Sequence, residues 1–125
     1  MRGTELLNEL INLSDDAVLI NDVKFVFKGD EVVLDSSIGV EELCEKNNMP
    51  PTWYTKLNKV SGRPVLIINN INSITEDEQA KFIDIIKYKK TGIYDLPKNT
   101  LVLITSSSSA EYKINSNILS LVMHI

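Results

Sequence analysis

Two strand-sized apolar runs constrain the fold of this chain more than any other feature. PVLIIN, residues 64–69, and TLVLIT, residues 100–105, are apolar at consecutive positions instead of alternate ones. Continuous apolar runs of this length are typical of central parallel strands that are covered on both faces. Between them, TEDE at residues 75–78 has the spacing of a capping box and predicts a helix that extends to about Lys90. Strand, capped helix and strand in this order predict an α/β sheet.

The remaining segments extend this pattern. Residues 17–20 and 122–125 are expected to be strands, and residues 23–27 and 31–35 flank the turn Lys28-Gly29-Asp30, which predicts an N-terminal β-hairpin. Short helices are expected over residues 4–13, 38–47, 52–60 and 115–119. The predicted fold is therefore α/β, a three-layer sandwich with a mostly parallel central sheet and an N-terminal β-hairpin.

Length, charge and cysteine content narrow the class of protein. The 125 residues predict a single domain over residues 1–125, and no apolar run approaches the roughly 20 residues that a membrane span needs. No secretory signal is visible, and the lone cysteine, Cys44, cannot form an internal disulfide, so a cytoplasmic location is expected. The net charge of -4 weighs against nucleic-acid binding. A local basic patch remains an alternative, formed by Lys81, Lys87, Lys89, Lys90 and Lys98.

The second half of the chain has the motif order of a known family. RPVLIINNIN, residues 63–72, resembles a Walker B strand, and residues 74–107 resemble the helix, turn and sensor 1 strand that follow it. SNILSLVMHI, residues 116–125, resembles a segment that in the family contains a short helix, Ser-Arg-Phe and a final strand. Residues 62–125 therefore resemble the second half of an AAA+ ATPase core, in particular of MoxR-like and clamp-loader-like members. The resemblance implies a truncated core without the small helical lid, and it leaves residues 1–61 unassigned.

The catalytic positions implied by this resemblance hold the wrong residue types. Asn69 and Asn70 occupy the Walker B positions, where an aspartate and a glutamate serve Mg²⁺ and the attacking water. An amide carries no charge for a hard cation and cannot accept a proton. The sequence also contains no GxxxxGK loop to hold phosphates.

Sensor 1 and the arginine finger depart from the family in the same way. The sensor 1 polar residue falls at Thr105, Ser106 or Ser107, and Leu121 stands at the arginine-finger position. With these departures, the resemblance implies no catalytic residue and no cofactor. The expected function is a non-catalytic AAA+-like interaction domain that binds or regulates an ATPase-containing assembly.

A second function stays open at this stage. Loops 69–73 and 105–109 follow two predicted neighbouring strands, and open α/β sheets bind ligands at the carboxyl ends of their strands. The alternative is therefore a small nucleotide-binding protein or NTPase with an atypical site.

Other chemistry-bearing residues give weaker signals. Trp53 and Tyr54 follow Pro50-Pro51 and are candidate interface residues, but core packing is the favoured role for Trp53. His124 and Cys44 lie far apart in the sequence, so no metal site is expected. Frequent Ile, Asn and Lys suggest an AT-rich bacterial or phage genome.

Overall fold

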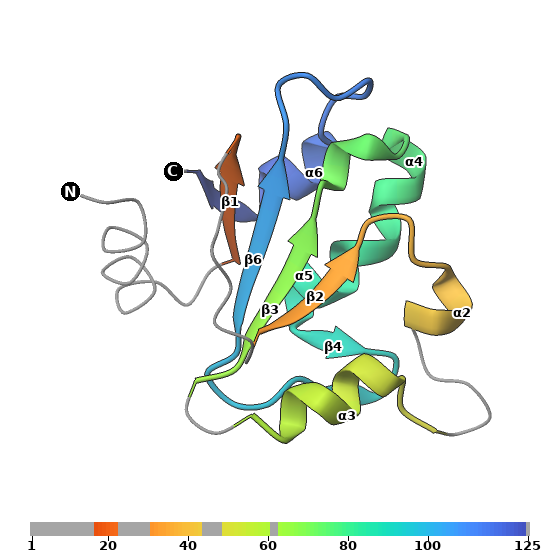
Figure 1. The fold of residues 1–125 in the computed structure, drawn as a ribbon, viewed down its shortest axis with the longest axis vertical. Coiled ribbons are helices and arrows are strands. Elements are labelled where there is room, and N and C mark those ends of the chain that lie inside the picture. The colour runs from red at the N-terminus through yellow and green to blue at the C-terminus, as the bar shows by residue number, and fades with distance from the viewer. Residues whose placement is uncertain (1–16, 23–30, 44–48, 61–62, 125) are drawn as a thin grey trace.

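A parallel five-stranded sheet forms the centre of the molecule (Figure 1). The computed structural model describes residues 17–22, 31–43, 49–60 and 63–124. The strands of this sheet are β1 (Ala17–Asn21), β2 (Val32–Asp35), β3 (Val65–Asn69), β6 (Leu101–Ser106) and β7 (Val122–His124). Their order across the sheet is β2-β3-β6-β1-β7. The predicted fold class, α/β with a mostly parallel sheet, is confirmed.

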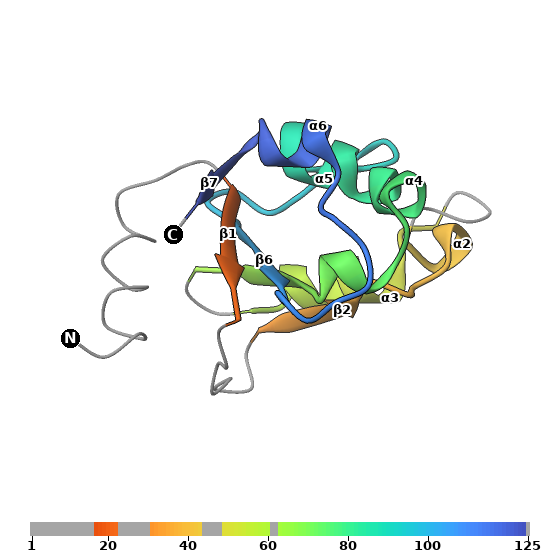
Figure 2. The same ribbon diagram turned by 90° about the horizontal axis from the view of Figure 1, so that it is seen from above.

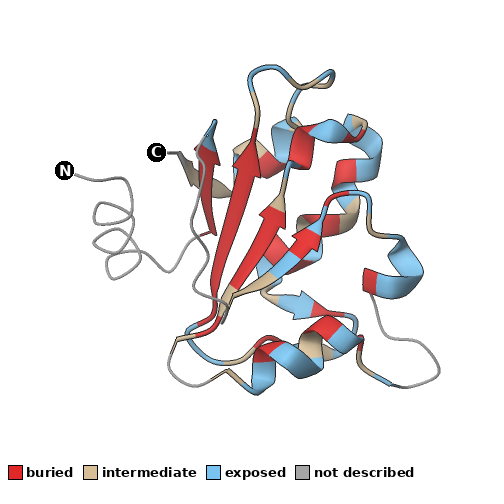
Figure 3. Cartoon of the chain, in the orientation of Figure 1, coloured by how far each residue is buried: buried red, intermediate tan, exposed pale blue. Residues whose placement is uncertain are grey.

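The two apolar runs that dominate the sequence are adjacent strands in the middle of the sheet. Leu66 of β3 pairs with Val102 of β6, and Leu103 of β6 pairs with Val18 of β1. Every residue of β6 is buried, and Figure 3 shows this strand as buried along its whole length. Burial of successive residues requires cover on both faces, as the continuous apolar pattern predicted.

Side chains from the two faces of the sheet belong to separate clusters. Leu66, Ile68 and Ile104 join the main core with the apolar residues of the described helices, whereas Ile67 and Leu103 join a smaller cluster of strand residues. Figure 2 shows α5 and α6 along one face of the sheet. The described helices are α2 (Val40–Leu43), α3 (Thr52–Asn58), η1 (Ile71–Ser73), α4 (Glu76–Gln79), η2 (Ala80–Phe82), α5 (Ile83–Tyr88) and α6 (Ser116–Leu119).

A capping hydrogen bond marks the start of the helix between β3 and β6, and a left-handed residue marks its end. Thr75 Oγ1 accepts the N–H of Glu78 at 3.2 Å, which is the first half of the predicted capping box. The helix then runs through α4, η2 and α5 to Lys89, whose φ of 53° places the C-cap in the left-handed region. This prediction is confirmed to within two residues of Lys90.

Other expectations have mixed outcomes. The helices near residues 52–60 and 115–119 and the strands near residues 17–20 and 122–125 are confirmed. The expected helix at 4–13, the first hairpin strand at 23–27 and Cys44 lie outside the described residues. The second hairpin strand is β2, which pairs in parallel with β3. An antiparallel pair, β4 (Lys90–Thr91) and β5 (Tyr94–Asp95), was not predicted.

In the described part of the chain, no helix has the length and hydropathy to cross a bilayer.

Candidate functional site at the carboxyl edge of the sheet

Polar residues gather where β1, β3 and β6 end. These parallel strands point toward the same edge of the sheet, so Asn21, Asn69 and Ser106 end their strands side by side (Figure 1). The Walker B and sensor 1 positions of the predicted resemblance therefore lie on one edge.

Thr105 connects the two strand ends through its hydroxyl group. Its Oγ1 donates to Asn69 Oδ1 at 2.7 Å and accepts the backbone N–H of Asn70 at 2.9 Å. Thr105 is only 4% exposed. A hydroxyl has one hydrogen to donate, and Thr105 uses it on Asn69. The oxygen of the Asn69 amide is therefore directed at a protein neighbour.

Asn70 turns the chain immediately after β3. Its φ of 55° and ψ of 53° lie in the left-handed region, which asparagine tolerates better than most residues. The local backbone conformation therefore suits the asparagine at this position.

Asn72 binds the loop after β6 with both ends of its amide. Nδ2 donates to Ser107 O at 2.7 Å, and Oδ1 accepts the N–H of Ser107 at 3.0 Å. The Asn72 amide thus pairs with the C=O and the N–H of Ser107, as the backbone of a neighbouring strand would. Asn72 belongs to loop 69–73, which the sequence placed at the end of a predicted strand, but the sequence did not identify its partner Ser107.

The end of β1 completes the network with two residues that the sequence did not single out. Ser106 Oγ donates to Asn21 Oδ1 at 2.9 Å, and the Asp22 N–H donates to Ser106 O at 2.9 Å. The Ser108 N–H donates to Asp22 Oδ1 at 2.8 Å. Hydrogen bonding from Ser108 holds the pKa of the Asp22 carboxyl below its ordinary value of 3.8.

A hollow of about 580 Å³ lies beside this network. The segment after β6 forms part of its wall, and Gln79 of the capped helix holds this segment in place. This fully buried side chain donates to Lys113 O at 2.8 Å and accepts the N–H of Asn115 at 2.7 Å. The hollow is lined by Leu19, Asn21, Asn72, Ser106, Ser107, Ser108, Ala110, Glu111, Tyr112, Lys113, Ile114 and Leu119.

The other predicted site residues lie away from this edge. Leu121, at the arginine-finger position, is half-buried against the main core. Trp53 is 7% exposed and its Nε1 donates to Leu43 O at 3.0 Å, so it packs in the core, the role that the sequence favoured for it. Tyr54 is half-buried and donates to Asp95 O at 2.6 Å.

Two lysines of the predicted basic patch have partners within the protein. Lys81 Nζ donates to Ile38 O, and burial lowers the pKa of this lysine. Lys90 Nζ lies 3.5 Å from Asp95 Oδ1. Lys81 is therefore half-buried, and the charge of Lys90 lies beside a carboxylate. Across the described ranges, no group of three or more His, Cys, Asp or Glu side chains is placed to hold a metal ion.

Comparison with known proteins identifies no relative of this chain. No family model matches the chain, and neither the curated proteins nor the solved structures contain a significant match. Function is therefore inferred from the fold and from the carboxyl edge.

Proposed function

We propose that the chain is a non-catalytic AAA+-like interaction domain that binds or regulates an ATPase-containing assembly. The observation that carries this proposal is the hydrogen bond between Thr105 and Asn69. In an active core of this family, the position of Asn69 serves the metal ion, and the position of Thr105 is one of the three at which the sensor 1 residue would fall. In this chain they bond to one another, and Asn72 bonds to Ser107. The edge residues thus contribute to the stability of the fold.

The strand order supports the family resemblance. β1 lies between β6 and β7, and two strands separate it from β2. The AAA+ core has the same arrangement, with its first strand between its fourth and fifth. Rossmann folds place the first strand beside the second, and flavodoxin-like folds place the first strand beside both the second and the third. The order across the sheet therefore favours an AAA+-like core over these two classes.

The short connection between β1 and β2 supports the proposal that this domain is not catalytic. The phosphate loop of a P-loop protein follows a strand and leads into a helix, and a complete βαβ unit takes about 30 residues or more. Residues 22–31 leave ten positions between β1 and β2, and these residues contain no GxxxxGK motif. The connection is too short for a phosphate loop followed by a helix of ordinary length.

The proposal predicts that nucleotide does not raise the thermal stability of the protein. It also predicts that the protein binds a partner that contains an ATPase domain. Thermal unfolding of the full chain is expected to give the same midpoint with and without millimolar Mg²⁺-ATP. A ligand at about 100 times its dissociation constant would add about 2.7 kcal/mol and raise the midpoint by several degrees. Capture from a lysate of the source organism should enrich a protein with an ATPase domain relative to an unrelated α/β bait. A clear midpoint shift, or repeated captures without any ATPase, would contradict the proposal.

The hollow at the carboxyl edge favours a second candidate, a small nucleotide-binding protein or NTPase. Its volume of about 580 Å³ is in the range of small-molecule sites, and it lies where open α/β sheets bind ligands. Ala110→Phe would fill the hollow, whereas Ala80→Phe would place the same ring on an exposed helical position. A midpoint shift with Mg²⁺-ATP that is lost in the first variant and kept in the second would favour this candidate.

A further inference from the structure

The hollow of about 580 Å³ at the carboxyl edge has a buried floor and an exposed mouth. Of its lining residues, Leu19 and Ser106 are each 4% exposed, and Asn72 is 7% exposed. Glu111 and Lys113, which lie in the segment after β6, are exposed. The burial of the lining residues therefore increases from the mouth of the hollow to its floor.

The polar groups of the floor already have partners within the protein. Ser106 Oγ donates to Asn21 Oδ1, and both ends of the Asn72 amide bond to the backbone of Ser107. A polar group that is already hydrogen-bonded gains little when it exchanges its partner for a ligand. The apolar residues of the lining are Leu19, Ala110, Ile114 and Leu119. The floor therefore favours an apolar part of a ligand.

Three consecutive residues of the lining offer polar groups to a ligand. Within the part of the chain that the structure describes, the Glu111 carboxylate, the Tyr112 hydroxyl and the Lys113 ammonium group make no hydrogen bond or ion pair. Tyr112 is half-buried between its two exposed neighbours. One carboxylate and one ammonium group at the mouth favour a ligand that carries both charges.

We propose that the hollow binds a free α-amino acid with an apolar side chain. The side chain of the ligand contacts the apolar floor, and its ammonium group lies beside Glu111. Its carboxylate accepts hydrogen bonds from Lys113 Nζ and from the Tyr112 hydroxyl. This site acts independently of a protein partner, so it does not require the partner to be an ATPase.

The same lining disfavours a ligand that carries phosphate groups. Lys113 is the only cationic residue among the lining residues, and Glu111 would repel a phosphate. Backbone N–H groups commonly hold phosphates in α/β proteins. The N–H groups of Ser107, Ser108 and Ala110 all bond within the protein. The lining therefore suits an amino acid better than a nucleotide.

The test begins with thermal unfolding of the full chain in the presence of each common free amino acid at millimolar concentration. An amino acid with a branched aliphatic or aromatic side chain is expected to raise the midpoint, whereas glycine and glutamate should not. Calorimetric titration then measures the dissociation constant of the best ligand. Acetylation of its ammonium group, or conversion of its carboxylate to an amide, should raise this constant about tenfold or more.

Two variants of the chain test the position of the site. Glu111→Lys should weaken binding about fivefold or more, because the reversal replaces an attraction by a repulsion. The control Glu41→Lys makes the same charge change on α2, outside the hollow, and should leave the affinity unchanged. Ala110→Phe should abolish binding by filling the hollow, whereas Ala80→Phe, at an exposed position of the capped helix, should retain it. Unfolding scans without ligand check that each variant is folded, and if Ala110→Phe is not, Glu111→Lys and the altered ligands decide.

Three results would overturn the proposal. They are the absence of a midpoint shift with any free amino acid, an acetylated ligand that binds as tightly as the free one, and full binding by a folded Ala110→Phe variant. A midpoint shift with Mg²⁺-ATP that Ala110→Phe abolishes would assign the hollow to a nucleotide and would also overturn it. Failure to capture an ATPase would leave amino-acid binding unaffected, so this proposal and the proposed function fail separately.

Discussion

Thr105 Oγ1 and Asn69 Oδ1 lie 2.7 Å apart at the ends of two adjacent parallel strands. The bond joins the two central strands at the edge where α/β proteins place their chemistry. Asn69 and Thr105 directly follow the paired residues Ile68 and Ile104, and their polar atoms bond to one another across the two strands.

Removal of the Thr105 hydroxyl should destabilise the protein measurably. Thr105→Val keeps the shape of the side chain but leaves Asn69 Oδ1 and the Asn70 N–H without this partner. We expect the free energy of unfolding to fall by about 1 to 3 kcal/mol, measured by urea denaturation. The matched control is Thr55→Val, at an exposed position of α3, which should change stability by less than about 0.5 kcal/mol. Equal effects of both variants would contradict a structural role for the Thr105 hydroxyl.

Gln79 should be among the most sensitive polar positions of the molecule. It is fully buried and also donates to Ile74 O at 3.0 Å, besides its two bonds to the segment after β6. Gln79→Leu has a similar volume but leaves these buried groups unpaired, so we expect a loss of about 3 kcal/mol in urea denaturation. Lys113→Ala keeps the backbone carbonyl and should cost far less. A neutral Gln79→Leu would show that the segment does not depend on this side chain.

Asp22 should make stability depend on pH in the acid range. Because Ser108 lowers its pKa in the folded protein below 3.8, the charged carboxylate stabilises the fold above about that pH. This contribution is lost as the pH falls through the folded-state pKa. Asp22→Asn tolerates the left-handed φ of 55° and keeps an acceptor oxygen, so it removes chiefly the charge.

The measurement for Asp22 is the thermal midpoint between about pH 7 and pH 2.5. The unaltered chain should exceed Asp22→Asn in midpoint at neutral pH, and the difference should shrink as the pH falls. Asp84→Asn, at an exposed position of α5, serves as the control. A difference that stays constant with pH would exclude the titration of Asp22 as its cause.

Lys89→Gly should stabilise the protein. Lys89 has a φ of 53° at the C-cap of α5, where glycine is the preferred residue. Its backbone bonds to Ile85 and Leu96 do not involve the side chain, so they are retained. We expect a gain of about 0.5 to 1 kcal/mol in urea denaturation, whereas Lys87→Gly, inside the helix, should lose about 1 kcal/mol. A loss in both variants would indicate that the Lys89 side chain contributes packing.

Local patterns were sufficient to predict the centre of the fold. The apolar runs identify β3 and β6, and the capping box identifies the start of α4, because these signals depend on neighbouring residues. The pair β4 and β5 was missed because each strand has two residues and depends on distant contacts. Thr91 Oγ1 donates to Leu43 O at 2.9 Å, and Tyr54 binds Asp95.

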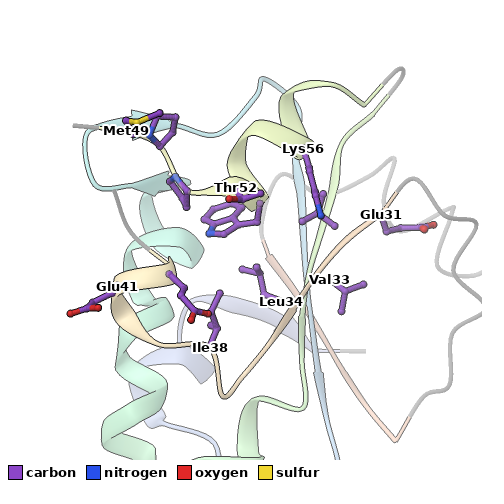
Figure 4. Close-up of a pocket in the computed structure, with 13 residues that line it drawn as sticks. Glu31, Val33, Leu34, Ile38, Glu41, Met49, Thr52 and Lys56 are labelled. Carbon is purple, nitrogen blue, oxygen red and sulfur yellow. The ribbon is translucent and has the colours of Figure 1, made fainter. Parts of the chain in front are cut away.

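The candidate site was predictable only where strand ends adjoin. Asn69 and Thr105 are the last residues of two apolar runs that are typical of neighbouring strands, so their proximity could be expected. The contact between Asp22 and Ser108 depends on β1 lying beside β6, an order that no local pattern encodes. The same holds for a groove of about 750 Å³ between β2 and helices α2 and α3 (Figure 4), because the segments that line it are brought together only in the folded chain.

The position of β1 has a consequence for the order of events during synthesis. Its two partners, β6 and β7, come last among the strands, so β1 emerges from the ribosome long before either neighbour exists. Pairing between residues so distant in sequence is slow to form, because the intervening chain must first be ordered. The apolar residues 17–20 therefore have to remain without their native partners until β6 and β7 have been translated.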